Sequence, residues 1–495
     1  MKKEKIILLF ILLLAAFLRL YKIQGYLTFL GDEGRDVLVV KRLLLDHKLT
    51  LLGPTASVGG FFLGPFYYYL IAPFLWLFGM NPIGPAVMVA LFGVATVWLI
   101  YFVGKRFFDV PTGLLAAGLY AISPVVITYS HSSWNPNLMP FFSLLIIWFA
   151  WQATQKKDLK LLGLIGFLFG LALQLHYLTV FLMVIVGIYW LFFGQQCNNW
   201  RAYFWLVGGF AIGWSPFLAF ELRHNFPNFR SLVDFLLHGE ETGFVWKNFL
   251  PTIGNVSLRL FERLVVANQK VLAEILLLLT LPLAGYQWVK QKGRQTFWPL
   301  LGLWLVLGIG LFGFYQDSIY DYYFGFMFPL PFLLTAFALV RLAKKGRLGC
   351  LVAWSLGLLI IFVNWQANPF YRSPNYQLRQ AEQISRIVYD NTSGQPFNFA
   401  LITGQNSDHA YRYFLELWGA RPVTIEGLLV DPERRTVTDQ LLVVCEVDDC
   451  HPLGHSLWEI AGFGRAEIVD QWSAPGGITV MRLIHWEARS ESPED

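Results

Sequence analysis

Apolar stretches suited to membrane helices recur along the first 365 residues. The chain begins with a lysine-rich start and an apolar run, Met1–Tyr21, and no A-x-A-like cleavage site follows, so we expect an uncleaved first helix. A membrane-spanning helix needs about 20 predominantly apolar residues. Ten further stretches are candidates: 86–104, 112–129, 138–152, 161–176, 178–193, 202–220, 271–289, 297–315, 322–340 and 348–365. The pattern predicts about eleven transmembrane helices.

After residue 365 the pattern changes to short, alternating strands and helices. Residues 397–404 and 438–447 are typical of strands, and residues 409–419 and 455–463 are typical of helices. A Pro-Gly-Gly sequence at 475–477 fits the turn of a closing hairpin. The predicted fold is mainly α: a polytopic membrane helix bundle over residues 1–365, followed by a small soluble α/β domain over residues 366–495.

Composition narrows the class of protein further. Hydrophobic residues make up 56% of the chain and charged residues only 14%, whereas soluble globular proteins carry about 25% charged residues. This excludes a soluble enzyme, a disordered chain and a fibrous protein. Residues 366–495 carry a net charge of −8 and the first 365 residues carry +13. The chain has no P-loop and no nucleotide-binding glycine-rich loop, so we do not expect ATP-driven transport. We also expect no nucleic-acid partner.

Lysine and arginine accumulate in alternate loops, which sets the orientation in the membrane. With a cytoplasmic N-terminus, the inner loops collect sixteen basic and three acidic groups. The basic residues are Lys2, Lys3, Lys5, Lys105, Arg106, Lys156, Lys157, Lys160, Arg201, Lys290, Lys292, Arg294, Arg341, Lys344, Lys345 and Arg347. The uncharged segment Phe61–Phe78 would reverse this bias if it crossed, so we place it at the outer interface. We predict a multi-pass plasma-membrane protein with outer loops 21–84 and 221–270 and an extracytoplasmic tail.

Four cysteines are too few for a disulfide framework. Cys445 and Cys450 lie close together in the tail, where an extracytoplasmic location would allow a local disulfide. The alternative for this pair is a zinc site completed by His451 and His455.

Charged residues crowd the start of the first outer loop, which reads Gly31-Asp32-Glu33-Gly34-Arg35-Asp36. A solvated loop with internal ion pairs would explain them. In the functional alternative, a carboxylate takes the proton of an attacking hydroxyl, while Arg35 binds a phosphate leaving group through its planar fork. This chemistry suits a lipid-linked donor held at the membrane surface.

From this loop onward, the order of several short motifs resembles a known family. The motifs are the acidic pair Asp32-Glu33, then Gly64–Tyr69, Leu77–Gly79, Gly104–Phe108, Gly113–Ala117, Ala121–Pro124 and Tyr129-Ser130. The arrangement resembles the polyprenyl-phosphate-sugar-dependent glycosyltransferases of the GT-C superfamily. The similarity is best over residues 1–240. These include the family 39-like protein O-mannosyltransferases, the aminoarabinose transferases of lipid A and the Rgt-type lipopolysaccharide glycosyltransferases.

The resemblance implies roles for the charged residues of this loop. The acidic pair supplies the base that activates the acceptor, which falls on Asp32 with Glu33 as its partner or substitute. Arg35 would bind the donor phosphate. The family reaction inverts the anomeric centre by direct displacement, so that one base is enough. No cofactor is implied, although Asp32, Glu33 and Asp36 offer oxygens that a hard divalent ion accepts.

Other outer turns supply further candidates for substrate binding. His131 and Asn135 lie in a polar turn between two helices, and relatives often carry an arginine at the position of His131. His176 and Tyr177 join the next pair of helices, where simple interfacial anchoring competes with sugar binding.

The loop after the seventh predicted helix contains Glu221, Arg223 and His224. We expect Arg223 to assist Arg35 at the donor phosphate, and Glu221 and His224 to contact substrate. For the neighbouring Arg230, Arg259 and Arg263, contact with lipid headgroups is the better interpretation.

The expected function is transfer of a hexose or pentose from a polyprenyl-phosphate carrier to a glycan, lipid or protein acceptor on the outer face. The alternative is a lipid or glycan transporter or flippase without transferase chemistry. Transport predicts ionisable groups or broken helices near the bilayer midplane, whereas the charges here gather in outer loops.

Overall fold

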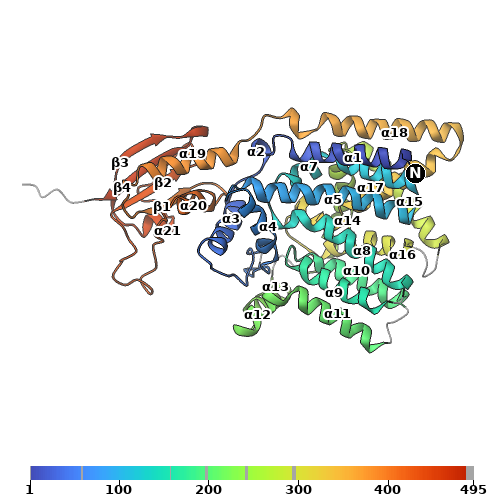
Figure 1. Ribbon diagram of the computed structural model, residues 1–495, viewed down its shortest axis with the longest axis horizontal. Helices are drawn as coiled ribbons and strands as arrows, with labels where there is room; N and C mark the ends of the chain where they lie inside the picture. Colours follow the sequence, from blue (N-terminus) through green and yellow to red (C-terminus); the bar gives the residue numbers. More distant parts are fainter. Residues whose placement is uncertain are drawn as a thin grey trace, which may run out of the picture. The chain divides into compact units, whose positions relative to one another are not determined.

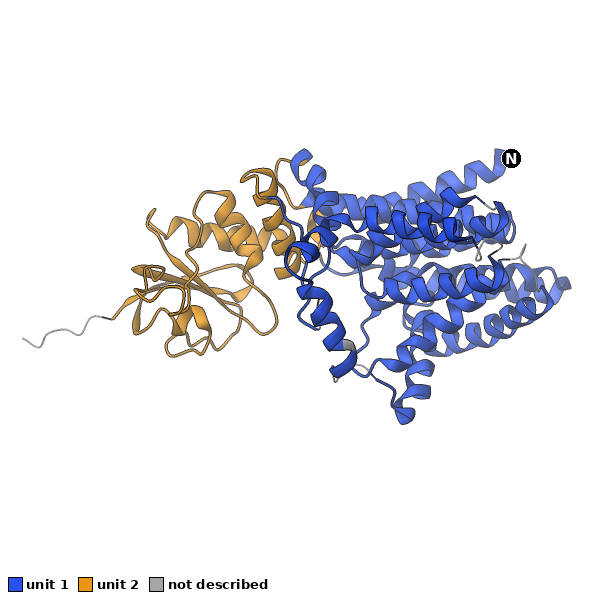
Figure 2. Cartoon of the chain, turned by 90° about the horizontal axis from the view of Figure 1, so that it is seen from below, with its two compact units in different colours: residues 1–23, 49–77, 83–373 blue, residues 24–48, 78–82, 374–495 orange. Residues whose placement is uncertain are grey.

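The computed structural model describes residues 2–56, 59–156, 158–194, 199–239, 243–291 and 297–486. Lys157, Lys292 and Arg294, which contribute to the predicted inner basic clusters, lie outside the described residues. The chain forms two compact units (Figure 2). Unit 1 takes residues 1–23, 49–77 and 83–373, and unit 2 takes residues 24–48, 78–82 and the chain from residue 374 onward.

Unit 1 is a bundle of apolar helices (Figure 1). The long ones are α5 (Ile83–Phe107), α8 (Met139–Lys156), α15 (Lys270–Lys290) and α18 (Gly346–Gln366). Shorter apolar helices are α4 (Phe66–Leu77), α9 (Leu159–Leu173), α10 (Thr179–Phe193) and α16 (Trp298–Gly310), the last continued by η2 (Leu311–Phe314). The others are α1 (Lys2–Leu20), η1 (Asn135–Leu138), α13 (Pro227–His238), α14 (Trp246–Leu264) and η4 (Pro369–Tyr371), with α2 (Ile23–Tyr26) at the boundary of the two units.

Three helix pairs are sharply bent. They are α6 (Val110–Ile122) with α7 (Pro124–Ser130) at 64°, α11 (Trp200–Gly213) with α12 (Ser215–Arg223) at 79°, and η3 (Asp321–Met327) with α17 (Pro329–Ala343) at 62°. A proline stands in the first turn after each bend, at Pro124, Pro216 and Pro329. Proline removes an N–H donor and clashes with the preceding turn, so a helix cannot continue straight through it.

Each of the eleven predicted spans contains helix, and the multi-pass character of the chain is confirmed. The number of membrane crossings is smaller by helix length than the sequence pattern predicts. By length and composition, four helices of the described chain can cross a membrane, or up to seven if each bent pair is one span. The predicted count of eleven therefore stays a prediction.

Glycines bring helices of unit 1 into close contact. A Cβ atom at Gly166 of α9 would lie 2.0 Å from the carbonyl oxygen of Leu206, and one at Gly209 of α11 would lie 1.9 Å from that of Gly163. Small residues allow this approach, and in lipid such backbone packing supplies much of the association energy. Larger residues at these positions would force α9 and α11 apart.

Unit 2 contains a four-stranded sheet of order β1-β2-β4-β3. Its strands are β1 (Asn398–Ile402), β2 (Gln440–Cys445), β3 (Ala466–Ser473) and β4 (Thr479–His485). β1 and β2 are parallel, and β4 pairs antiparallel with both β2 and β3. The helices of this unit are α3 (Gly31–Leu44), α19 (Gln377–Asp390), α20 (His409–Leu417) and α21 (Trp458–Ala461). The turn η5 (Pro475–Gly477) closes the predicted hairpin, with Gly476 at a φ of 78° that favours glycine.

The small C-terminal α/β domain is thus confirmed in type, with differences in detail. The helix predicted over 455–463 is only one turn long, and the pattern analysis missed the amphipathic helix α19. Cys445 and Cys450 form a disulfide, which rules out the alternative zinc site because both thiols are used.

One segment of the predicted outer loop 21–84 belongs to unit 2. Residues 24–48, which include all of α3, cluster with the tail. α3 packs on α20, where Phe29 contacts the rings of Tyr413 and Phe414, and Arg42 and Lys41 pair with the buried carboxylate of Glu416. The division of the chain into domains at residue 365 remains a prediction, but the charged loop start is part of the same compact body as the tail.

Candidate functional site

Three charged residues of α3 form one ion cluster. Arg35 Nη1 lies 2.9 Å from Asp32 Oδ1, and Arg35 Nη2 lies 2.9 Å from Asp36 Oδ1. The Asp32 side chain is 53% exposed, that of Arg35 is 22% exposed and that of Asp36 is fully buried. Asp32 is therefore the carboxylate of this cluster that solvent or a substrate can reach, and Arg35 holds it in place.

Glu33 has a different environment from Asp32. Its side chain is buried, and Oε2 accepts a hydrogen bond of 3.1 Å from the backbone N–H of Leu30. A carboxylate at the third helical position that bonds back to the residue before the helix stabilises the helix start. In this arrangement Glu33 positions the turn that presents Asp32.

The two glycines of the cluster allow α3 to approach the start of α20. A Cβ atom at Gly34 would lie 2.3 Å from the backbone nitrogen of Ala410, and one at Gly31 would lie 2.1 Å from Ser407 Oγ. The Gly31 N–H donates to Asn406 Oδ1, and Asn406 donates to Glu446. The alternation of glycine and charge in this loop therefore reflects close packing as well as chemistry.

Burial makes Asp36 an unusually weak acid. Its pKa is raised to about 7, chiefly because burial penalises the charged form, while Arg35 opposes the rise. Asp36 Oδ2 has no hydrogen-bond partner among the described residues. The sequence identified Asp36 only as a metal-ligand alternative, since nothing in the pattern distinguishes a buried aspartate from an exposed one.

His409 at the start of α20 is a second residue that the sequence analysis missed. Its Nδ1 and Ser407 Oγ share a hydrogen bond of 2.8 Å. Burial, the neighbouring Arg35 and other cations lower the pKa of His409, and Asp408 opposes this. Only the pairing of α3 with α20 reveals that this histidine belongs to the cluster.

The three carboxylates do not surround a common point. Glu33 bonds to Leu30, whereas Asp36 lies buried under Arg35. Among the described residues no group of three or more His, Cys, Asp or Glu side chains is arranged to hold a metal ion.

Asn135 and His176 of unit 1 line one aromatic corner. Asn135 Nδ2 donates 2.7 Å to the carbonyl of Leu175, and the His176 ring lies 5.8 Å from that of Tyr322 and 5.6 Å from that of Tyr323. The two tyrosines come from η3, which the sequence placed inside a span.

His131 is buried at the end of α7, where its ring lies 6.0 Å from that of Phe370. It is in the electrostatic reach of Arg19, a fully buried arginine of α1 that donates to the carbonyls of Ala15 and Ala121. These surroundings favour a structural role for His131 over direct contact with a substrate.

Glu221 and Tyr177 fix the loop before α4. The buried Glu221 carboxylate accepts 2.7 Å from Asn228 Nδ2, and Asn228 Oδ1 accepts 2.8 Å from the Phe62 N–H. The Tyr177 hydroxyl donates 2.5 Å to the Phe62 carbonyl. Tyr177 and Glu221 are thereby connected through the backbone of Phe62. The sequence pattern did not predict this connection, because the residues are far apart in the chain.

Arg223 and His224 lie exposed at the end of α12. His224 stacks on Phe220 at 4.2 Å, while the Arg223 side chain has no hydrogen bond or ion pair within the described parts of the chain. Arg259 and Arg263 behave differently, because both bind the carboxylate of Asp321 at 2.6 Å. Of these three arginines, Arg223 is the one available to an external anion.

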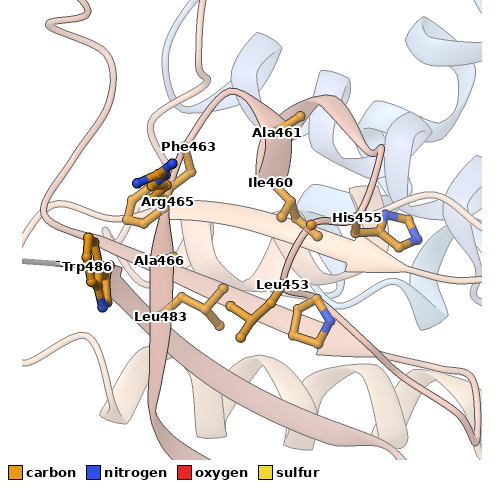
Figure 3. A pocket seen from close by; sticks show the side chains of 12 residues that line it. Leu453, His455, Ile460, Ala461, Phe463, Arg465, Ala466, Leu483 and Trp486 are labelled. Carbon is orange, nitrogen blue, oxygen red and sulfur yellow. The ribbon is translucent and has the colours of Figure 1, made fainter. Parts of the chain in front are cut away.

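The tail has a pocket of its own (Figure 3). It has a volume of about 500 Å³ and lies beside α21, β3 and β4. Figure 3 shows Arg465 and Trp486 on one side of the pocket and His455 on the other, with Leu453 and Leu483 between them. The sequence analysis singled out His455 only as a zinc ligand and did not predict this pocket.

The comparisons with known proteins concern both sequence and fold. Residues 63–220, less than half of the chain, match a family described as dolichyl-phosphate-mannose-protein mannosyltransferase. No curated protein matches the chain in sequence. Two solved structures are similar in fold at 13% identity. ArnT from Cupriavidus metallidurans bound to undecaprenyl phosphate aligns with a TM-score of 0.65 over 96% of this chain and 97% of its own. The archaeal oligosaccharyltransferase AglB from Archaeoglobus fulgidus, in complex with an inhibitory peptide and a dolichol-phosphate, aligns with a TM-score of 0.53 over 99% and 75%.

Proposed function

We propose that this chain, a multi-pass membrane protein with the GT-C fold that its motifs predicted, is a glycosyltransferase that uses a polyprenyl-phosphate sugar. The observation that carries the proposal is the Asp32–Arg35 pair, in which an exposed carboxylate is held by a cation at the start of a tightly packed helix. Two structures of similar fold contain a polyprenyl phosphate, which supports the class of donor.

Asp32 is the proposed general base. As the acceptor oxygen attacks C1 of the sugar, its proton passes to the Asp32 carboxylate, and the bond from C1 to the phosphate oxygen breaks. The electron pair of that bond leaves with the polyprenyl phosphate. Attack opposite the leaving group inverts C1 in one step, so no covalent intermediate with the enzyme is needed. Glu33 contributes by holding the helix start.

Arg35 of unit 2 is the proposed ligand of the donor phosphate, and Arg223 of unit 1 is proposed, separately, as a residue that binds an anion. A guanidinium binds phosphate through two parallel N–H donors. Arg223 is exposed, while Arg35 is engaged with Asp32 and would exchange that carboxylate for phosphate as the donor arrives. The exchange frees the Asp32 carboxylate to accept the proton, which couples donor binding to activation of the base.

The remaining predicted residues are assigned to sugar contact, to positioning of a loop or to support of a helix. Asn135 and His176 border an aromatic corner suited to a neutral sugar, because tyrosine faces pack on its C–H groups and imidazole and amide groups form hydrogen bonds with its hydroxyls. Tyr177 and Glu221 position the loop before α4, and His131 supports α7. His224 follows Arg223 in the chain and is proposed to contact substrate beside it.

We place the reaction on the outer face of the plasma membrane, with the N-terminus in the cytoplasm, because the inner loops hold the basic excess. The acceptor is a hydroxyl of a glycan, lipid or protein. The proposed step requires no cofactor, because the base and the phosphate ligands come from the chain.

The experiment that tests this function uses membranes that contain the chain and a panel of radiolabelled polyprenyl-phosphate hexoses and pentoses, with membranes lacking the chain as background. Label should appear in a product other than the donor for at least one sugar. A transporter would redistribute donor between leaflets without forming a new glycosidic bond. Donor redistribution with no labelled product from any sugar would contradict the proposal.

A further inference from the structure

A cavity of about 260 Å³ lies among four helices of unit 1, and none of the candidate site residues lines it. Its wall comes from α8, α9, α10 and α11 and is almost entirely apolar, with Ala153, Leu162, Val186 and Leu206 among the lining residues. The glycine contacts that bring α9 against α11 do not close the space towards α8 and α10, and a Cβ atom at the lining Gly187 would meet no atom within 4 Å.

The cavity lies near the ends of these helices that carry basic residues. Ala153 is one turn from Lys156 at the end of α8, Leu162 follows Lys160 at the start of α9, and Leu206 is less than two turns from Arg201 at the start of α11. These three basic side chains are exposed, and those of Lys156 and Lys160 have no ion-pair partner in the described chain. Asp158, which caps α9, is the acidic residue beside them.

Within unit 1, the cavity lies towards the opposite helix ends from Asn135, His176 and Tyr177. Asn135 precedes the start of α8, whereas Lys156 ends it about 27 Å further along the axis. In the same way, His176 and Tyr177 follow the end of α9, whereas Lys160 lies at its beginning. A sugar bound beside Asn135 and His176 would therefore lie at the other end of these helices from Lys156 and Lys160.

We propose that this cavity holds one acyl chain of an anionic phospholipid whose headgroup phosphate binds Lys156, Lys160 and Arg201. An acyl chain runs along the helices of a bundle, so a headgroup at the helix ends sends its chain down past Ala153 and Leu162. Basic residues at such ends attract anionic headgroups. The site needs no transferase activity, and it would stand if the proposed function failed.

Charge decides which lipid is bound. The apolar wall contributes little to selectivity, because a chain is as well solvated in the bilayer as in the cavity. Each basic group near the membrane surface favours an anionic lipid about fivefold, so three basic groups and one acidic group predict a preference of about 25-fold over a zwitterionic lipid.

The test is native mass spectrometry of the full-length protein in detergent, titrated with dioleoyl-phosphatidylglycerol or dioleoyl-phosphatidylcholine. Gly187→Leu fills the cavity and should weaken phosphatidylglycerol binding about tenfold or more. Gly208→Leu is the matched control, because a Cβ atom at Gly208 of α11 also meets no atom within 4 Å and this residue does not line the cavity. The combined variant Lys156→Gln, Lys160→Gln and Arg201→Gln should lose the preference for phosphatidylglycerol.

Three results would overturn the proposal. The first is phosphatidylglycerol binding by Gly187→Leu that equals the wild type at an unchanged melting temperature. The second is a preference for phosphatidylglycerol that persists in the variant without the three basic groups. The third is displacement of bound phosphatidylglycerol by an equal concentration of polyprenyl phosphate, which would assign the cavity to the chain of the donor.

Discussion

The buried aspartate of α3 makes the stability of unit 2 depend on pH. In the folded chain the pKa of Asp36 is about 7, against an ordinary value of 3.8. The folded state thus holds the proton more tightly than the unfolded state does, so stability falls as pH rises from about 4 to about 7 and then levels off. Asp36→Asn keeps the shape and the acceptor oxygen for Arg35 but removes the titration.

The size of the effect follows from the two pKa values. At 1.36 kcal/mol for each pKa unit, the full shift costs the folded wild type about 4 kcal/mol above pH 7. Roughly 3 kcal/mol of this cost falls between pH 5 and pH 8, because the remainder has already been lost at pH 5. The difference in melting temperature between Asp36→Asn and the wild type should therefore grow by roughly 5 °C over this range.

The assay is thermal unfolding of the purified full-length protein in detergent at both pH values, scored as variant minus wild type so that other titrating groups cancel. The variant should gain relative to the wild type at pH 8. An equal difference at both pH values, or a variant that is less stable at pH 8 than at pH 5 relative to the wild type, would refute the reasoning.

Three further predictions follow from the same cluster. Arg35→Ala should raise KM for the donor about tenfold or more, with a smaller change in kcat. Arg35→Lys should restore only part of the donor affinity, since a point charge replaces a planar fork. Equal KM values for the wild type and Arg35→Ala in steady-state kinetics would contradict this. Gly34→Ala should lower the melting temperature by several degrees, because its Cβ would lie 2.3 Å from the Ala410 nitrogen. Gly427→Ala is the control, because a Cβ atom there meets no atom within 4 Å. Equal melting temperatures for the two variants would argue against the close packing of α3 on α20. As pH rises through about 7, Asp36 ionises and competes for Arg35, so KM for the donor should rise in the wild type and stay flat in Asp36→Asn; parallel pH profiles would show that the two sites are not linked.

The membrane bundle could be predicted from the sequence because apolar stretches are a local signal. Each of the predicted spans contains a helix, and the hairpin turn at 475–477 is where the pattern placed it. The bends were harder to predict from the sequence, since a stretch such as 322–340 is largely apolar although Pro329 divides it. The proline was visible in the sequence, and with more weight it would have separated Tyr322 and Tyr323 from the span.

The candidate site was predictable only in part, because burial and long-range pairing leave no local trace. The sequence pointed to Asp32 and Arg35, which form an ion pair, but not to the burial of Asp36 or to His409, which come from the packing of α3 on α20. The spacing of Gly31 and Gly34 was the available clue, since two glycines in a charged helix start suggest that another backbone lies close.

The central claim is that Asp32 is the base for sugar transfer from a polyprenyl phosphate, and single-turnover transfer by purified Asp32→Asn tests it most directly. With saturating donor, the rate should fall about 10²–10⁴-fold, while the melting temperature stays close to that of the wild type and donor affinity is not weakened. Asp46→Asn, which removes a carboxylate paired with Lys41 just beyond the end of α3, should keep the wild-type rate. A rate for Asp32→Asn within a few-fold of that of Asp46→Asn would contradict the account.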